Sequence, residues 1–372
     1  MDEAFRKRSV FPLHLHWDGS IPAEALFAQA QRQHKKLLLP EKDSEGRPLA
    51  YASEEERMIS SPIQLQQVLY ELRKYAMMDV FGIPIGLMQS PDALHEAAFG
   101  LCAYLQEQHV PYAEVRFAPQ YHTSQLSLED VPSVAADAFL AGKEQTGVDV
   151  RLIISIDRAS SPDVGVGIAR AAVAANKRYP LMILGIDLAC EENTNPPEKH
   201  YAAFRETFDT PLKRTVHAGE MCTESINALN MCNAIAVLRA DGIAHALQLY
   251  KYPPLIKRMA EQGIRLESNP ICNKFFFNVD LEELHLDELL RQGVLVTINP
   301  DDPAFIPDCS THDNLYAMQQ LHGPDFVDRV IENSIEAAWG LSRAEKDNYL
   351  RLVRQEAKEY RQARETASIS KR

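Results

Sequence analysis

Eight short apolar runs, separated by longer amphipathic stretches, are the feature that most limits the folds open to this chain. Each run has the length of a strand, several are rich in β-branched residues, and most are bounded by Gly, Pro or Asp. The runs cover residues 10–16, 112–119, 148–157, 181–189, 214–218, 242–247, 263–269 and 293–299. Strands that alternate with helices form parallel sheets, and eight is the number of strands in a closed (β/α)8 barrel of the TIM type.

The stretches between these runs have the pattern of helices that would cover such a barrel. Apolar residues recur every three or four positions over 91–109 and 127–146, and 161–179 is rich in alanine; Ser90, Ser127 and Ser161 stand where helix starts are expected. A doubly wound open sheet is the alternative. It usually has fewer strands and a glycine-rich phosphate turn after the first one, whereas the first run here ends in HWDGS. We therefore predict an α/β fold, a single (β/α)8 barrel domain over residues 1–372.

Three segments fall outside the repeating pattern. Residues 40–62 are dominated by Pro, Ser and charge, and are too long for a simple connection after the first helix, so they predict a lid or a mobile insert. Residues 324–365 predict extra C-terminal helices packed outside the barrel, and 366–372 a frayed tail.

Composition excludes several classes of partner. The chain of 372 residues has a formal charge of −13, which repels phosphate backbones and anionic lipid surfaces. Its N-terminus lacks the apolar core of a signal peptide, and no apolar run approaches the ~18 residues of a membrane span. Six scattered cysteines without a CxxC pair favour reduced thiols. We expect a cytoplasmic protein that binds neither nucleic acid nor membranes; its oligomeric state is open.

Residues with side chains suited to metal binding and proton transfer gather at the ends of the predicted strands. In the first run, His14 and His16 are two residues apart and so face the same side of a strand. The carboxyl ends of all strands of a parallel barrel meet at one face, where barrel enzymes keep their active sites. Histidine nitrogens and carboxylate oxygens suit Zn²⁺, which keeps one position for water when it is catalytic. The other strand-end residues of this kind are His217, Glu220, His245, Asp301 and Asp302.

The motifs HLHWDGS, HAGE and NPDDP, in this order and at these separations, resemble the adenosine deaminase family of zinc-dependent purine deaminases. GIDLACEE at 185–192 and PYAEVRFAP at 111–119 resemble two further strands of that family, and the similarity runs from about residue 10 to 340. No lysine follows the strand in GIDLACEE, where binuclear relatives often have a modified lysine that bridges two metals, so one zinc ion per chain is expected.

The resemblance implies a role for each matching residue. His14, His16, His217 and Asp301 would bind the zinc. Glu220 would protonate the purine ring nitrogen beside the amino-bearing carbon, and His245 would orient the water on the zinc and assist its deprotonation. Asp302 would hydrogen-bond the imidazole side of the purine, and Asp18 would receive the ribose 5′-hydroxyl. Because Glu220 must be protonated to act, its pKa is expected to be raised by burial or by a hydrogen bond from the ligand.

Several positions depart from the family pattern and affect the choice of substrate. Cys190 stands where the family usually has a glycine that lets the backbone approach the purine, so its side chain would narrow the pocket. Ala244 and Ala246 replace glycines beside His245, and Trp17 replaces a smaller aliphatic residue, which suggests that Trp17 influences substrate choice.

The expected activity is hydrolytic deamination of adenosine, or of a close 6-aminopurine nucleoside, to the 6-oxo product and ammonia. Asp18 favours a nucleoside, because members that act on the free base tend to have Glu there. Cys190 favours the alternative, a deaminase of free adenine or a modified aminopurine. A catalytically silent purine-binding barrel is a weaker alternative, because every implied ligand and Glu220 are present. A nucleic-acid deaminase of the His/Cys/Cys type is excluded by the missing HxE…PCxxC pattern.

Overall fold

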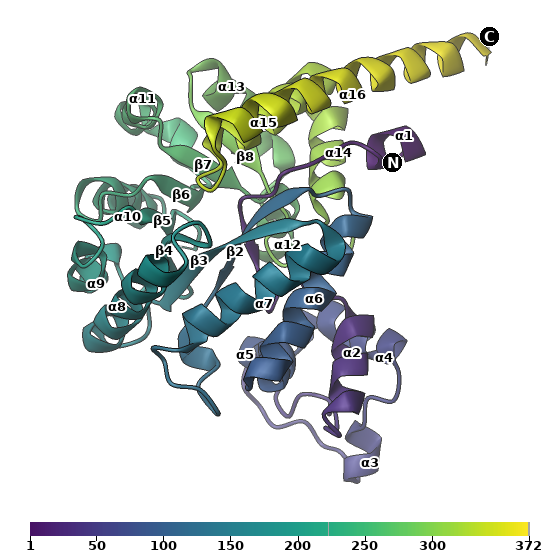
Figure 1. Cartoon of the computed structure of the whole chain (residues 1–372), viewed down its shortest axis with the longest axis vertical. Coiled ribbons are helices and arrows are strands. Elements are labelled where there is room, and N and C mark those ends of the chain that lie inside the picture. Colours follow the sequence, from purple (N-terminus) through teal and green to yellow (C-terminus); the bar gives the residue numbers. More distant parts are fainter. Residues whose placement is uncertain (222, 371–372) are drawn as a thin grey trace.

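The protein is a barrel of eight parallel strands, each paired with the next in chain order (Figure 1). The computed structural model describes residues 1–221 and 223–370, with side chains up to residue 366. The strands are β1 (Leu15–His16), β2 (Tyr112–Phe117), β3 (Asp149–Asp157), β4 (Ile183–Ala189), β5 (Lys213–Ala218), β6 (Gly242–His245), β7 (Arg265–Ser268) and β8 (Leu295–Ile298). Seven of the predicted runs contain one strand each, β5 begins one residue before its run, and the predicted (β/α)8 fold is confirmed.

The barrel closes where the first strand meets the chain just after β8. Leu15 pairs in parallel with Asp301. The amide of His16 donates to the Asp301 carbonyl (3.0 Å), and the amide of Asp301 donates to the His14 carbonyl (3.2 Å). The amide of Leu13 donates to Oδ1 of Asn299 (2.8 Å). We call this junction of residues 13–16 with residues 299–301 the seam, and three predicted metal ligands, His14, His16 and Asp301, lie on it.

Helices surround the strands, and their starts follow the capping rules. Ser90 and Ser161 cap α6 and α8 with their side chains, as predicted, and proline follows each serine. The helix expected from Ser127 instead begins at Val131. The helices are α1 (Glu3–Arg6), α2 (Ala23–Arg32), α3 (Glu54–Arg57), α4 (Pro62–Tyr70), α5 (Met77–Leu87), α6 (Pro91–Glu107), α7 (Val131–Thr146), α8 (Pro162–Arg178), α9 (Tyr201–Arg205), α10 (Glu224–Ala236), α11 (Pro253–Gln262), α12 (Pro270–Phe277), α13 (Leu286–Arg291), α14 (Thr311–His322), α15 (Pro324–Ala337) and α16 (Arg343–Ser370).

The segments outside the repeat are built around this frame. The polar insert 40–62 contains α3, which lies at the outer end of the α2–α5 group in Figure 1. Short antiparallel bridges hold it, among them Leu38 with Met58 and Asp43 with Tyr75. Whether it acts as a lid stays a prediction. The predicted C-terminal helices are α15 and α16. The predicted frayed tail begins near the end of α16, and its residues 371–372 lie outside the described chain.

The barrel interior beneath the site contains charged rather than purely apolar side chains. Arg116 of β2 donates to Glu267 of β7 (2.6 Å), and Arg265 donates to both Glu267 (2.7 Å) and Glu114 (2.6 Å). Each of these four side chains is at most 1% exposed. Buried charges are costly unless they are paired, so this network holds neighbouring strands in one register. Within the described residues, no helix is long and apolar enough to span a membrane.

Candidate active site

Four side chains converge at the carboxyl ends of β1, β5 and β8. The nitrogen or oxygen ligand atoms of His14, His16, His217 and Asp301 all lie within 4.8 Å of one another. Burial lowers the pKa of both His14 and His16, which favours the neutral imidazoles that a metal requires. Despite its burial, Asp301 has a pKa held well below the usual range by His14. The pKa of His217 is instead raised, against its burial, by the charge of Asp187 and the hydrogen bond to it, so a metal ion would have to displace a proton there. Three imidazole nitrogens and one carboxylate oxygen suit zinc, so these residues fit that ion.

A second layer of buried groups orients these side chains. Nδ1 of His14 lies 3.0 Å from Oε2 of Glu267, a carboxylate whose pKa is kept well below normal, against burial, by Arg116 and Arg265. The ionised carboxylate accepts, so Nδ1 donates and Nε2 of His14 is left to face Asp301 at 2.9 Å. Nδ1 of His217 is held in the same way by Oδ1 of Asp187, at 3.1 Å.

Sequence reasoning assigned no role to Asp187 or Glu267. Both are fully buried carboxylates in the middle of predicted strands, and that is the signal that could have identified them. A carboxylate facing a barrel interior needs a partner, and a histidine at the end of a neighbouring strand is a suitable one. Cys272 was also missed: its thiol donates to Oδ2 of Asp301 at 2.8 Å.

Glu220 and His245 lie beside the four-residue cluster. Nε2 of His245 is 3.5 Å from Oε1 of Glu220 and 3.7 Å from Oδ2 of Asp301. On the other side of the ring, Nδ1 of His245 lies 2.8 Å from Oδ1 of Asn273, which can only accept, so Nδ1 is the donor and Nε2 faces the site. Burial raises the pKa of Glu220, which confirms the expected direction.

Asp18 and Asp302 are two further buried carboxyl groups at this face, each 8% exposed. Burial raises the pKa of Asp18 to about 6. Burial, followed by the charges of Asp301 and Asp18, raises the pKa of Asp302 well above the usual range, which favours the protonated carboxyl group. Among the described atoms, Oδ1 of Asp302 is buried without a hydrogen-bond partner. It is therefore a polar group that a ligand can satisfy.

Cys190 lies just past the end of β4, exposed, with a φ of +75° that favours glycine. Asp157, the last residue of β3, is the sheet partner of Ala189, the residue before Cys190. The Asp157 carboxylate accepts a hydrogen bond from the Tyr121 hydroxyl (2.8 Å). Asp18 and Cys190 are near enough to this pair to contribute to the raised pKa of Tyr121. Asp18, Tyr121, Asp157 and Cys190 therefore lie near one another at the ends of β1–β4, and we call these four residues the acidic rim.

Trp17 does not line the site, so the expectation that it influences substrate choice is wrong. It is fully buried and packs against Phe117 and Phe139, with ring centroids 5.3 and 4.6 Å away. The reason is strand alternation: His14 and His16 face the interior, so residue 17 faces the helices. Ala244 lies within β6, paired with His217 and Glu267, while Ala246 has a left-handed φ of +48°.

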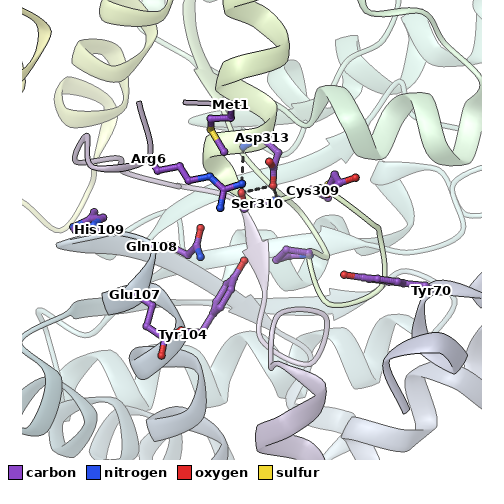
Figure 2. A pocket seen from close by; sticks show the side chains of 12 residues that line it. Met1, Arg6, Tyr70, Tyr104, Glu107, Gln108, His109, Cys309, Ser310 and Asp313 are labelled. Carbon is purple, nitrogen blue, oxygen red and sulfur yellow. Dashed lines mark hydrogen bonds between the residues drawn. The ribbon is translucent and has the colours of Figure 1, made fainter. Parts of the chain in front are cut away.

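A separate cavity of about 350 Å³ lies behind the segment that follows Asp302 (Figure 2). Its walls come from the N-terminus, the ends of α4 and α6, and the start of α14, where Ser310 and Asp313 form a capping box. Its twelve lining residues include none of the predicted site residues. This cavity is therefore not the active-site pocket.

The barrel with its ligand-bearing strand ends defines a (β/α)8 enzyme whose site lies at the carboxyl face. Comparison with known proteins gives the family: the adenosine deaminase family model matches residues 11–355. The chain belongs to the adenosine deaminase family, and is thus an aminohydrolase that acts on a purine amine.

Individual relatives are distant but cover most of the chain. An adenosine deaminase of Clostridium acetobutylicum is 27% identical over 331 residues, covering 88% of this chain and 92% of its own. An adenine deaminase of Crocosphaera subtropica is 27% identical over 343 residues, covering 90% and 95%. The family is therefore established, while adenosine and adenine both occur among the substrates in relatives' names.

Solved structures agree on the fold. The adenine deaminase of Arthrobacter aurescens superimposes with a TM-score of 0.76 at 24% identity, covering 94% of this chain and 99% of its own. A zinc-bound amidohydrolase of Burkholderia ambifaria gives 0.74 at 20% identity, with 98% and 95% covered. The N6-mAMP deaminase of Arabidopsis gives 0.72 at 15% identity, with 95% and 100% covered. At these identities the likeness shows the fold alone.

Proposed function

We propose that the protein hydrolyses the 6-amino group of adenosine, or of a close 6-aminopurine nucleoside, with one zinc ion held by His14, His16, His217 and Asp301. The observation that carries the proposal is the convergence of these four groups beside Glu220, whose side chain is 9% exposed and whose pKa is raised. When bound, zinc lowers the pKa of a coordinated water toward ~7 and so supplies a nucleophile at neutral pH.

The residues around the cluster would handle the protons. Nε2 of His245, fixed by Asn273 on the far side of the ring, accepts a proton from the attacking water. The water oxygen adds to C6 of the purine while Glu220, whose pKa is raised by burial, delivers its proton to the ring nitrogen N1. The C6–N6 bond then breaks: the amino group takes the proton held by His245 and leaves as ammonia, and the second proton of the water passes from the C6 hydroxyl to Glu220, which restores the starting enzyme. Such proton transfer typically contributes 10²- to 10⁴-fold.

The purine and its sugar would be held by the remaining carboxyl groups. Protonated Asp302 donates to the imidazole nitrogen of the purine, which gives its buried carboxyl a hydrogen-bond partner. Asp18 receives the sugar 5′-hydroxyl. The acidic rim supports an unphosphorylated substrate, because the carboxylates of Asp18 and Asp157 repel a phosphate group there. The cation beside this rim, Arg158, is buried and faces the carbonyls of Leu188 and His217 instead.

Free adenine is the second candidate. The exposed Cys190 side chain, where the family usually has glycine, supports a smaller pocket and hence a substrate without a sugar. The two candidates differ in what fills the acidic rim: a sugar in one case, water in the other.

One experiment tests the proposal. Purified protein of known metal content is incubated with adenosine, deoxyadenosine, adenine, larger 6-aminopurine nucleosides and AMP, following loss of the 6-amino chromophore. We expect turnover of a nucleoside and none of AMP, and at least a 100-fold loss of kcat in Glu220→Gln with unchanged zinc content. No activity on any of these compounds with metal bound would contradict the proposal, and preference for adenine would favour the second candidate.

A further inference from the structure

The loop that carries Glu220 is held by hydrogen bonds to a buried carboxylate that follows a different strand, β4. Glu192 follows β4 and is 1% exposed. Its Oε1 accepts from the amide of Gly219 (2.8 Å), and its Oε2 accepts from the amides of Glu220 (2.9 Å) and Met221 (3.3 Å). Three successive backbone amides therefore converge on one side chain, an arrangement that forms an anion-binding nest.

Two further groups complete this contact. Nδ2 of Asn230, on α10, donates to Oε1 of Glu192 at 2.8 Å. The Arg158 guanidinium lies 4.0 Å from the same oxygen and donates to the carbonyl of His217. The carboxylate is thus balanced by a buried cation and by charge-assisted hydrogen bonds, which are stronger than neutral ones. The segment from His217 to Met221 is held at both ends by one buried pair.

We call the hydrogen bonds from the amides of residues 219–221 to Glu192 the clamp, and the backbone at this point has little else to fix it. Gly219 turns the chain with a φ of +77°, and α10 begins only at Glu224, so the helix does not fix residue 220. Removing the acceptor would leave three amides to seek other partners, and the loop would shift. A misplacement of about 1 Å in a reacting group can cost 10²-fold in rate.

We propose that Glu192 is a positioning residue: it holds the backbone of Glu220 so that the carboxyl proton reaches the purine ring nitrogen in the transition state. This inference rests on the proposed deaminase function. Changes at Glu192 should therefore lower kcat and leave zinc content and KM nearly unchanged, because other side chains hold the zinc and Asp18 and Asp302 hold the substrate.

The neighbouring glutamate provides a matched control. Glu191 is only partly exposed, and its carboxylate accepts from the Thr194 hydroxyl and from the amide of Asn193 (2.8 Å) within its own turn. It makes no hydrogen bond to residues 219–221 among the described contacts. Glu191→Gln and Glu192→Gln therefore make the same chemical change one residue apart, and only the second alters the clamp.

The test compares Glu192→Gln, Glu192→Asp and Glu191→Gln in the zinc-loaded enzyme, on the nucleoside that the wild type turns over best. In Glu192→Gln the length is kept, but an NH₂ group faces backbone donors. In Glu192→Asp the charge is kept, but the carboxylate is drawn back by one methylene. We expect kcat to fall about 100-fold in the first and at least 10-fold in the second, with KM within threefold, zinc content unchanged and Glu191→Gln equal to wild type.

A binding measurement separates positioning from a merely structural role. The 6-oxo product has a planar C6 and takes no proton from Glu220, so its affinity should change by less than threefold in both Glu192 variants. A tetrahedral C6-hydrated purine nucleoside should bind more weakly, by the factor lost in kcat/KM. The inference is overturned if both Glu192 variants keep kcat within threefold, or if product affinity and zinc content fall together with kcat. Should Glu192→Gln fail to fold, Glu192→Asp decides alone. A wild type that is inactive on every aminopurine refutes the proposed function instead.

Discussion

Gly19 gives a way to displace Asp302 without altering the carboxyl group itself. A Cβ on residue 19 would lie 1.6 Å from Oδ1 of Asp302 and 2.6 Å from its Cγ. The backbone of Gly19 is outside the left-handed region, so the obstacle to a side chain there is the Asp302 carboxyl group. Since non-bonded heavy atoms pack at about 3.5 Å, Gly19→Ala must move that carboxyl group by nearly 2 Å.

This displacement should remove the hydrogen bond that we assign between Asp302 and the purine. Such a bond is worth about 1 to 3 kcal/mol. At 1.36 kcal/mol per tenfold change, Gly19→Ala should lose about 5- to 150-fold in kcat/KM. Steady-state kinetics on the preferred nucleoside measures this loss.

A substrate without the imidazole nitrogen N7 makes the test specific. The 7-deaza analogue cannot accept from Asp302, so the wild type should turn it over more slowly by a similar factor, and Gly19→Ala should cause little further loss on it. Gly167→Ala is the control, because that helical position has only an ordinary contact, 3.6 Å from Leu128. Unchanged kcat/KM in Gly19→Ala, or an equal loss on both substrates, would refute the reasoning.

Three further predictions concern strain, pH and metal. Ala246→Gly relieves a left-handed φ of +48°, which costs ~1–2 kcal/mol in a residue with a Cβ; after the entropy of glycine in the unfolded chain, we expect a gain of about 0.5–1 kcal/mol in urea unfolding, and a loss would contradict the strain. Burial raises the pKa of Asp18 from 3.8 to about 6, so the folded state binds this proton more tightly, and stability falls as pH rises from about 4 to 6. Asp18→Asn should therefore be more stable than wild type at pH 8, by up to ~3 kcal/mol, with the difference vanishing below about pH 4; a difference independent of pH would count against it. Chelation should abolish turnover and lower Tm, both restored by Zn²⁺, because an ion at 1,000 times its Kd adds ~4 kcal/mol; an unchanged Tm would argue against the four-residue site.

The order of strands and helices was predictable because the spacing of apolar residues and the residues that begin or end an element are local features of the sequence. The run 263–269 contains β7 (Arg265–Ser268), and the serines before prolines begin α6 and α8. The run 10–16 shortened to two residues in β1, and the start of α7 moved by four residues, since such boundaries depend on long-range pairing that local patterns do not contain.

The convergence of His14, His16, His217 and Asp301 was also predictable, because parallel strand ends meet at one face. Glu192 was not, because its partners are backbone amides 27 to 29 residues away, and amides carry no sequence signal. Trp17 was predictable and was misjudged: the alternation that brings His14 and His16 together also turns residue 17 toward the helices.

The seam has a consequence for the order in which the site is made. Leu13 and Asn299, joined there by a hydrogen bond, are 286 residues apart, so the bond cannot form until most of the chain has been synthesised. Closing so long a loop carries a large entropic cost, and contacts of this kind form late in folding. A nascent or truncated chain that ends before residue 301 can fold several strands and helices, yet it lacks Asp301, the fourth predicted metal ligand and the partner of Nε2 of His14. Activity is therefore a property of the completed chain alone, and its appearance during refolding should mark the closure of the barrel.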